Sequence, residues 1–499
     1  MAEIGERRAW ALQAAPAALA PGIQRRKSHV WIFLAILAAL ASANVALGAN
    51  PLTVVLCLLS VLVGVYALAR YGTMNIAAIL VFLATFRYVG FPFVVKLVLG
   101  QPLDSNLRQP LDAFLVVLVG MAGYLVALAA ADKIPVGRPI LSPVLEGGRL
   151  GFLSVWAAVL GVAANVSVSL GGAGQGRAIT VASFFLPLLN VALIAATGAA
   201  LTRTHGRRAW DAWVISLVAL TLGFAMVRNS RMAVMVTVLS FLVAVVAFRG
   251  RATARQALTL AAASLVIVAF LTPVMLSVRS GRDALSWYQR IGATISSGIN
   301  WRSTESGYQA WRQGQLTSFG LLYFGASQNA LERLSLVNHV DLLKSATDAT
   351  GRVGLGDLAE AAPRVLPRFA YADKPLGYGH GYWLYRQLGI SNSGPYASAP
   401  LVGTGYAALG WAGAFAYPLV FGFTILIMLK KVSGWDLHGN IWAVYFLVTL
   451  QNDFVEGSTD AVLTSIFRSI PQDLAVLAVL VVLSRLSSHS VRRRSVVAR

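Results

Sequence analysis

The sequence predicts an all-α polytopic membrane protein with about twelve membrane-spanning helices and one large, mostly helical loop outside the membrane. Of the 499 residues, 57% are hydrophobic and 12% are charged, whereas a soluble domain carries about 25% charged residues. The apolar residues stand in long uninterrupted runs rather than at helical spacing, so lipid surrounds most of the chain. A single long polar stretch, 279–400, separates two groups of these runs.

Runs of roughly 20 residues, long enough to cross a bilayer, occur in both groups. They lie at 30–48, 52–69, 74–95, 111–131, 150–170, 179–201, 211–227, 231–248, 256–278, 401–429, 440–456 and 462–485. The chain should therefore have three regions. We expect about nine spans in 1–278, the loop in 279–400, and about three spans with a basic tail in 401–499.

The distribution of Lys and Arg predicts which ends of the spans face the cytoplasm. If the N-terminus is cytoplasmic, more than half of the 41 Lys and Arg fall in segments on the inside. Both termini are then inside, and the loop 279–400 is outside. This assignment accounts for most of the net charge of +21, so the charge does not require a nucleic acid as partner.

Within the long loop, the stretch 330–343 has apolar residues at positions 330, 331, 334, 337 and 340. This spacing predicts an amphipathic helix, and we expect that helix to lie on the membrane surface. Together with scattered prolines, it indicates that the loop is ordered and packs over the outer ends of the spans.

Several arginines map to the outer half of the membrane, where a charge is costly and is a functional candidate by default. They are Arg87, Arg228, Arg231, Arg279, Arg282 and Arg468. Guanidinium groups pair bidentately with phosphate, so a convergent set is typical of a polyanion site. The alternative for each arginine is that it reaches the membrane interface or pairs with a nearby acid.

Candidate proton acceptors are few on the outer side. Asp453, Glu456 and Asp460 follow one another at i, i+3 and i+7, which places them on one face of a helix. His380 lies in a loop rich in glycine and aromatic residues. A carboxylate or imidazole beside a polyanion could take the proton of an attacking hydroxyl. The alternative for the acids is a salt bridge to Arg468 or solvation at the surface, and the alternative for His380 is a structural role.

The aromatic residues beside this histidine, Tyr378, Tyr382 and Trp383, could stack on sugar rings. No pair of histidines has metal-ligand spacing, and neither a Walker loop nor a dinucleotide fingerprint occurs. The sequence therefore predicts no metal and no cofactor.

Three short stretches resemble the bacterial O-antigen polymerases (Wzy-type), also called oligosaccharide repeat-unit polymerases, which are related to the O-antigen ligases. They are Phe86-Arg87-Tyr88-Val89-Gly90-Phe91-Pro92, the turn Arg228-Asn229-Ser230-Arg231, and the run from Ser398 to Gly413, which enters the span after the large loop. The predicted architecture adds to this resemblance over nearly the whole chain.

The resemblance implies a metal-independent membrane glycosyltransferase of the GT-C type in the bacterial inner membrane. Its donor and acceptor would be glycans linked to undecaprenyl pyrophosphate, joined at the periplasmic face into O-antigen or a similar surface polysaccharide. A chain-length regulator is a further candidate partner. Two alternatives stay open: an O-antigen ligase with a lipid A-core acceptor, and a lipid-linked oligosaccharide flippase. The long loop argues against the flippase, because flippases usually have short loops and two similar halves.

Overall fold

The computed structural model describes residues 35–141, 147–170, 181–228, 230–249, 287–300, 306, 323–324, 334–366, 379–390 and 399–497. These residues are predominantly helical, and their β structure is limited to one isolated bridge between Asn75 and Asp436. Among them, eight helices are long and apolar enough to cross a membrane. The prediction of an all-α, multi-pass membrane protein is therefore confirmed at this level. The predicted span 256–278 lies outside the described residues.

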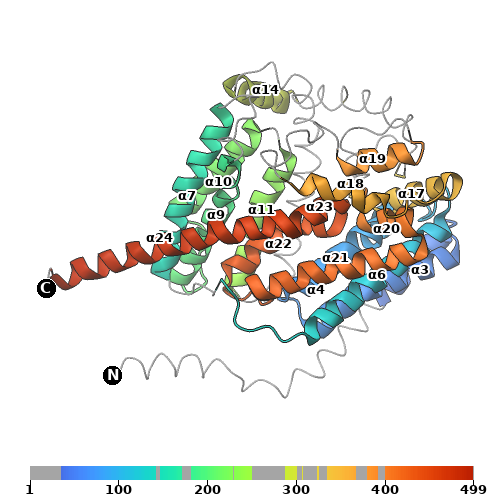
Figure 1. Cartoon of the computed structure of the whole chain (residues 1–499), viewed down its shortest axis with the longest axis horizontal. Helices are drawn as coiled ribbons and strands as arrows, with labels where there is room; N and C mark the ends of the chain where they lie inside the picture. The colour runs from blue at the N-terminus through green and yellow to red at the C-terminus, as the bar shows by residue number, and fades with distance from the viewer. Residues whose placement is uncertain are drawn as a thin grey trace.

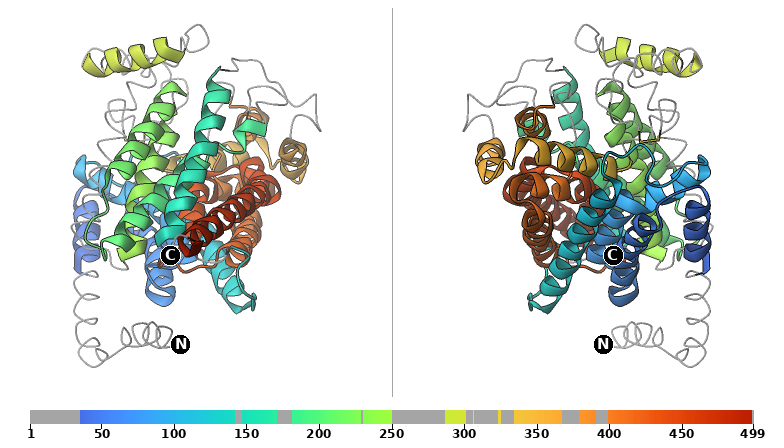
Figure 2. Two further views of the ribbon diagram at one scale, coloured as in Figure 1. Left: turned by 90° about the vertical axis from the view of Figure 1, so that its left-hand side faces the viewer. Right: turned by 90° about the vertical axis from the view of Figure 1, so that its right-hand side faces the viewer.

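The first half of the chain provides two groups of helices. They are α3 (Pro51–Tyr71), α4 (Ile76–Thr85), α5 (Phe91–Val98), α6 (Pro110–Lys133), α7 (Gly147–Leu170), α9 (Leu188–Arg203), α10 (Ala212–Val227) and α11 (Arg231–Arg249). Helices α3, α4 and α6 pack together, and α7, α9, α10 and α11 form a second group, visible in teal to light green in Figure 2. A short apolar helix, Ala35–Ala46, precedes α3.

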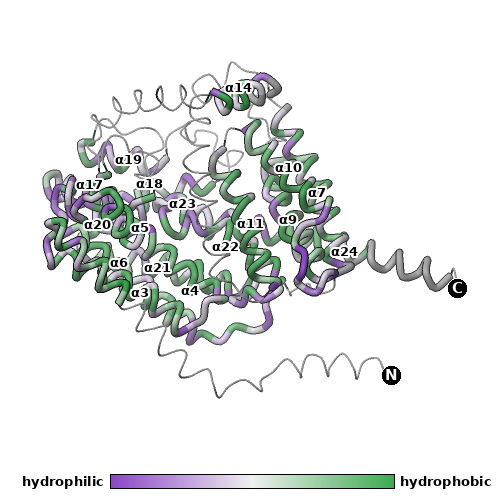
Figure 3. The backbone as a smooth tube through the Cα atoms, turned by 180° about the vertical axis from the view of Figure 1, so that it is seen from behind, coloured by the Kyte–Doolittle hydropathy of each residue, from purple (hydrophilic) through white to green (hydrophobic). Residues whose placement is uncertain are grey.

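The second half completes both groups. Its helices are α14 (Trp287–Ile299), α17 (Val337–Thr350), α18 (Gly356–Val365), α19 (His380–Gln387), α20 (Leu401–Leu409), α21 (Trp411–Val432), α22 (Ile441–Glu456), α23 (Thr459–Thr464) and α24 (Ile470–Val497). Helix α21 packs along α6, and α24 packs against α7. In Figure 3 hydrophobic residues cover most of α6, α21 and α11, as expected for helices in lipid.

Helix α22 is the central helix of the bundle. It contacts α4 and α21 on one side and α9 and α11 on the other. Its residues are buried almost throughout, with Trp442 and Phe446 fully inaccessible. Because protein rather than lipid surrounds α22, its last turns can carry polar and acidic residues that a lipid-facing helix could not carry cheaply.

The turns sort to two ends of the bundle. At one end, which we call the basic end, the turns around 72–75, 134–141 and 433–440 are joined by backbone hydrogen bonds, and the turn 204–211 is linked to Arg249 at the end of α11. Ile76 N donates to Trp435 O (2.9 Å), Leu437 N to Met74 O (2.9 Å) and Ile140 N to Lys431 O (3.0 Å). At the other end, the loop end, the turn 99–109 and the turn between α22 and α23 contact the long loop. This grouping agrees with the predicted order of inside and outside turns.

The described part of the long loop is largely helical. We call α17, α18 and α19 the loop helices; they lie together along one side of the bundle (Figure 1). Helix α17 packs against α20 and α6, and α18 packs against α23. The prediction for 330–343 is wrong in two respects. The helix begins at Val337, and its apolar residues are buried against protein rather than laid on a membrane surface. It begins late because Leu336 N donates to Arg87 O (3.2 Å), which holds the preceding residues in a non-helical course.

The predicted span 401–429 is two helices instead of one. Gly410 (φ +68°) ends α20 and reverses the chain into α21, a conformation that favours glycine. The two helices then approach so closely that a Cβ added at Gly413 would lie 1.9 Å from Gly405 O. The membrane-spanning part is Trp411–Val432. The glycines of the Ser398 to Gly413 run thus form a tight helical hairpin beneath the loop helices.

Candidate functional site

The site is built around Arg87, which lies in a π-helical segment, Phe86–Gly90, between α4 and α5. π-helical segments are rare in proteins, and those that occur are often found at functional sites. The Arg87 guanidinium forms an ion pair with Glu456 at the end of α22, and the two side chains are 16% and 25% exposed. Arg87 Nε also donates to Leu334 O (3.4 Å). Arg87 therefore joins the central helix to the chain that enters the first loop helix.

The three acids lie where α22 ends and α23 begins, but they do not share the one helical face that their spacing predicts, because α22 ends at Glu456 and Asp460 lies on α23. Asp453 accepts a hydrogen bond from Ser465 Oγ (2.7 Å). Glu456 pairs with Arg87, and Asp460 lies 3.4 Å from the backbone nitrogen of His380, which donates to it. Each acid thus faces a different neighbour. Glu456 contacts a cation, Asp453 contacts a hydroxyl group and Asp460 contacts a backbone nitrogen.

Arg468 lies in a second π-helical segment, Ser465–Ser469, between α23 and α24. Its neighbour Phe467 is 67% exposed, while Arg468 itself is partly buried. Within the described residues no carboxylate pairs with Arg468. Each π-helical segment thus carries a Phe-Arg dipeptide, and each adjoins the acidic end of α22 through Glu456 or Asp453.

His380 is completely buried and lies beside the equally buried Asp357. His380 Nε2 is 3.0 Å from Asp357 Oδ1 and 3.2 Å from the Asp357 carbonyl oxygen. Asp357 Oδ2 accepts hydrogen bonds from Tyr417 OH (3.0 Å) and Thr459 Oγ1 (2.8 Å). These contacts fasten α18 and α19 to α21 and α23. Because no surface of His380 reaches solvent in this state, its visible role is to hold the loop helices in place.

The predicted aromatic residues divide around this group. The Trp383 ring lies 5.2 Å from the His380 ring at an interplanar angle of 33°. Tyr382 is partly exposed, and its hydroxyl accepts from Arg386 Nη1 (3.2 Å). Tyr378 lies outside the described residues. Tyr382 and Trp383 therefore lie on α19, beside the contact between Asp357 and His380, which we call the latch.

A second attachment joins α17 to the start of α6. Asp341 accepts from the backbone nitrogens of Arg108 and Gln109 (both 2.8 Å), and burial raises the pKa of its carboxyl group. Lys344 is buried between Asp112 (2.5 Å) and Asp348 (2.7 Å). Burial lowers the pKa of this lysine, but its hydrogen bonds to the two carboxylates outweigh burial and raise it overall. Buried charged groups thus attach α17 to the start of α6 at the loop end of the bundle.

Other predicted arginines lie apart from this group or outside the described residues. Arg228 ends α10, where its backbone nitrogen donates to Phe224 O (3.0 Å), and Arg231 begins α11. Arg279 and Arg282 fall outside the described residues. The structure therefore brings together Arg87, Asp453, Glu456 and the backbone of His380, and it places Arg228 at a different turn.

Sequence reasoning missed Asp357, Tyr417, Thr459 and Ser465. Asp357 is in the first turn of an amphipathic helix, where an acid usually complements the helix dipole at the surface. Nothing in its local pattern distinguishes it from such an acid.

A comparison with known proteins finds no matching family model, no matching curated protein and no matching solved structure. Within the described residues, no group of three His, Cys, Asp or Glu is placed to hold a metal ion.

Proposed function

We propose that the protein polymerises undecaprenyl-pyrophosphate-linked oligosaccharide repeat units at the loop end of the bundle, as a metal-independent glycosyltransferase of the GT-C type in the bacterial inner membrane. The observation that carries this proposal is the Arg87–Glu456 ion pair at the junction of the central helix and the loop helices. It sets a phosphate-binding group and a candidate base side by side, with most of both side chains sheltered from solvent.

The reaction needs both groups. A hydroxyl of the incoming repeat unit attacks the anomeric carbon of the growing glycan, and its proton passes to the base. The bond between that carbon and the phosphate oxygen breaks, and its electron pair leaves with undecaprenyl pyrophosphate. The leaving group is already activated, so the step balances without a nucleotide or a metal. Guanidinium groups stabilise the negative charge that develops on it.

Among the candidate bases, the contacts favour Glu456. His380 is fully buried against Asp357. Asp453 accepts a hydrogen bond from the hydroxyl group of Ser465. Glu456 is paired with a cation that a pyrophosphate would also bind. When the donor's pyrophosphate takes the Arg87 guanidinium, the Glu456 carboxylate loses its counter-ion and becomes available to accept a proton. Donor binding would then prepare the base.

Arg468, in the second π-helical segment, supports the same proposal. It is a partly buried cation with no carboxylate partner among the described residues, and a charge in this position is costly without a compensating anion. In the proposal it binds the second phosphate of the donor. Tyr382, on α19, is the partly exposed aromatic residue nearest in sequence to the latch, and it would contact the sugars.

The direct test is incubation of the purified protein with one lipid-linked repeat unit and nothing else. A polymerase uses this single compound as both donor and acceptor and produces a ladder of lipid-linked products. Product that forms only when lipid A-core is added would identify a ligase instead. Movement of intact substrate across a vesicle membrane without chain growth would identify a flippase.

A further inference from the structure

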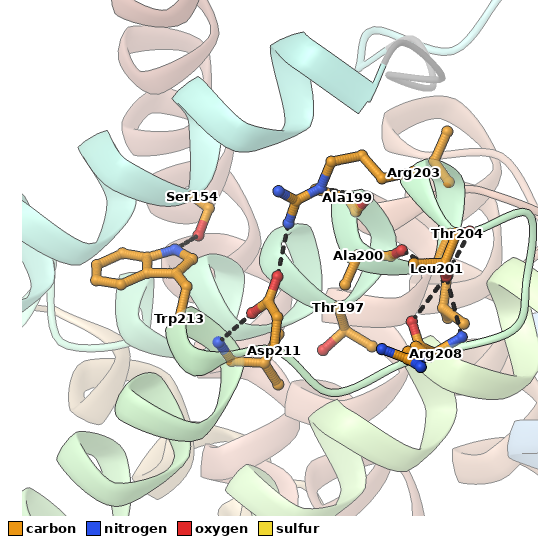
Figure 4. Close-up of polar contacts among 12 residues, drawn as sticks. Ser154, Thr197, Ala199, Ala200, Leu201, Arg203, Thr204, Arg208, Asp211 and Trp213 are labelled. Atoms are coloured by element: carbon orange, nitrogen blue, oxygen red, sulfur yellow. Dashed lines mark hydrogen bonds and ion pairs between the residues drawn. The ribbon is translucent and has the colours of Figure 1, made fainter.

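The turn between α9 and α10 at the basic end has a fixed shape. Gly206 N donates to Leu201 O (2.7 Å), and both His205 (φ 50°) and Gly206 (φ 80°) adopt the left-handed conformation that closes a helix. Thr204 Oγ1 lies 3.0 Å from both the nitrogen and the carbonyl oxygen of Arg208 and bonds to each. Figure 4 shows this turn and its contacts. These hydrogen bonds therefore fix the backbone conformation at Arg207 and Arg208.

Two tryptophans attach this turn to neighbouring helices. The Trp210 ring stacks on Phe241 of α11 with centroids 4.0 Å apart, and Trp213 Nε1 donates to Ser154 Oγ of α7 (2.8 Å). Both rings stay largely exposed, at 53% and 41%. Exposed tryptophan on a membrane protein is typical of the level where lipid headgroups lie. The two exposed tryptophans therefore indicate that the turn lies at the headgroup level of the membrane.

The charges on this turn are not balanced. Asp211 is its only acid, and Asp211 already binds Arg203 (2.6 Å) and the backbone nitrogen of Val214 (2.8 Å). Arg207, Arg208 and Arg249 are exposed, and Arg249 Nη2 reaches to 3.5 Å from the carbonyl oxygen of Arg207. Within the described residues no carboxylate pairs with these three arginines. Three exposed arginines without a carboxylate partner thus lie on or next to this turn.

We propose that Arg207, Arg208 and Arg249 form a binding site for the phosphate of an anionic phospholipid. The guanidinium fork matches phosphate oxygens, and the flanking tryptophans place that phosphate at the depth of a headgroup rather than in bulk water. The site lies on the end of the bundle opposite to the loop helices and does not depend on the proposed glycosyltransferase activity.

The test uses the full-length protein in nanodiscs made from phosphatidylglycerol and phosphatidylcholine. Mass spectrometry of the released protein measures which lipid it retains. The wild type should retain phosphatidylglycerol preferentially. The triple variant Arg207→Gln/Arg208→Gln/Arg249→Gln should lose this preference, by about fivefold for each arginine if the contributions add. The double variant Arg207→Gln/Arg208→Gln, which leaves the Arg249 contact intact, should lose an intermediate share.

A matched control removes three other exposed cations of the basic end, Arg70, Lys133 and Arg138, each replaced by Gln. This control should retain phosphatidylglycerol as the wild type does. An equal loss in the control would mean that only the overall charge attracts the lipid. Unchanged retention in the triple variant would place the lipid elsewhere. Either result overturns the proposal.

Inorganic phosphate is the remaining probe. If it displaces the retained lipid completely, the site takes free phosphate and the lipid assignment is wrong.

Discussion

Arg87 and Glu456 are 369 positions apart in the sequence and form an ion pair between a π-helical segment and the end of the central helix. Removing one partner of such a partly sheltered pair changes the behaviour of the other, because the remaining charge must find a new counter-ion. In the proposed reaction that new counter-ion for Arg87 is the donor pyrophosphate. The pair is therefore both a resting contact and the point where substrate would enter.

Glu456→Gln should lower the turnover of lipid-linked repeat units by about 10²–10⁴-fold, the usual contribution of a general base. The measurement is the initial rate of ladder formation. Asp460→Asn is the matched control, because it removes a neighbouring acid of the same turn that contacts the backbone of His380 rather than a cation. Comparable loss in both variants would show that the turn needs its negative charge and not a specific base.

The buried contacts of Asp357 and His380 should stabilise the folded protein. Asp357→Asn keeps the size of the side chain but replaces one of its two acceptor oxygens with an NH2 group. Either the bonds from Tyr417 and Thr459 or the contact with His380 then lose their acceptor, which should cost roughly 1–3 kcal/mol. Thermal unfolding in detergent measures this. Glu360→Gln on the same helix is the control, since its pair with Arg364 is partly exposed and contributes little. His380→Ala should also lower the unfolding temperature. If it abolishes turnover at an unchanged unfolding temperature, His380 is the base and the structural role is wrong.

The two ends of the bundle should face opposite sides of the membrane. The one cysteine, Cys57, is buried, so single cysteines can be introduced without removing it. Arg208→Cys at the basic end and Ala349→Cys at the exposed end of α17 should react with a membrane-impermeant reagent from opposite sides. If the predicted orientation holds, only Ala349→Cys reacts in intact cells. Labelling of Arg208→Cys alone would reverse the predicted orientation, and labelling of both would contradict the placement of the two ends on opposite sides.

The close approach of α20 and α21 should tolerate no side chain at Gly413. Gly413→Ala places a methyl group against Gly405 O and should cost about 1–3 kcal/mol through overpacking. Gly151→Ala is the control, because no heavy atom lies within 4 Å of the added Cβ in α7. Thermal unfolding compares the two. Equal stability would mean that the hairpin separates at no cost.

Much of the architecture could be predicted from the sequence, because membrane spans are recorded in long apolar runs that need no tertiary information. Arg87 in a span and the acids of 453–460 were recognisable for the same reason: a charge in an apolar run is conspicuous. The break at Gly410 was not, since the residues on both sides are equally apolar and only the packing of α20 on α21 separates them.

The partners of the candidate residues could not be predicted. His380 and Asp357 are adjacent only because α18 and α19 both pack on the bundle, and a lone acid in a helix's first turn is usually a surface residue. Likewise, the start of α17 depends on a hydrogen bond to the carbonyl of Arg87, more than two hundred positions earlier. Local patterns contain no signal for contacts of this range.

The affinity of undecaprenyl pyrophosphate for the purified protein tests the central claim most directly. If the pyrophosphate displaces Glu456 from Arg87, Glu456→Gln should bind it more tightly than the wild type does, while Asp460→Asn should change the affinity little. Arg87→Lys keeps the charge but loses the guanidinium fork, which should weaken binding by at least about tenfold. Equal affinity in the wild type, Glu456→Gln and Arg87→Lys would contradict the account, because the pyrophosphate would then bind away from this ion pair.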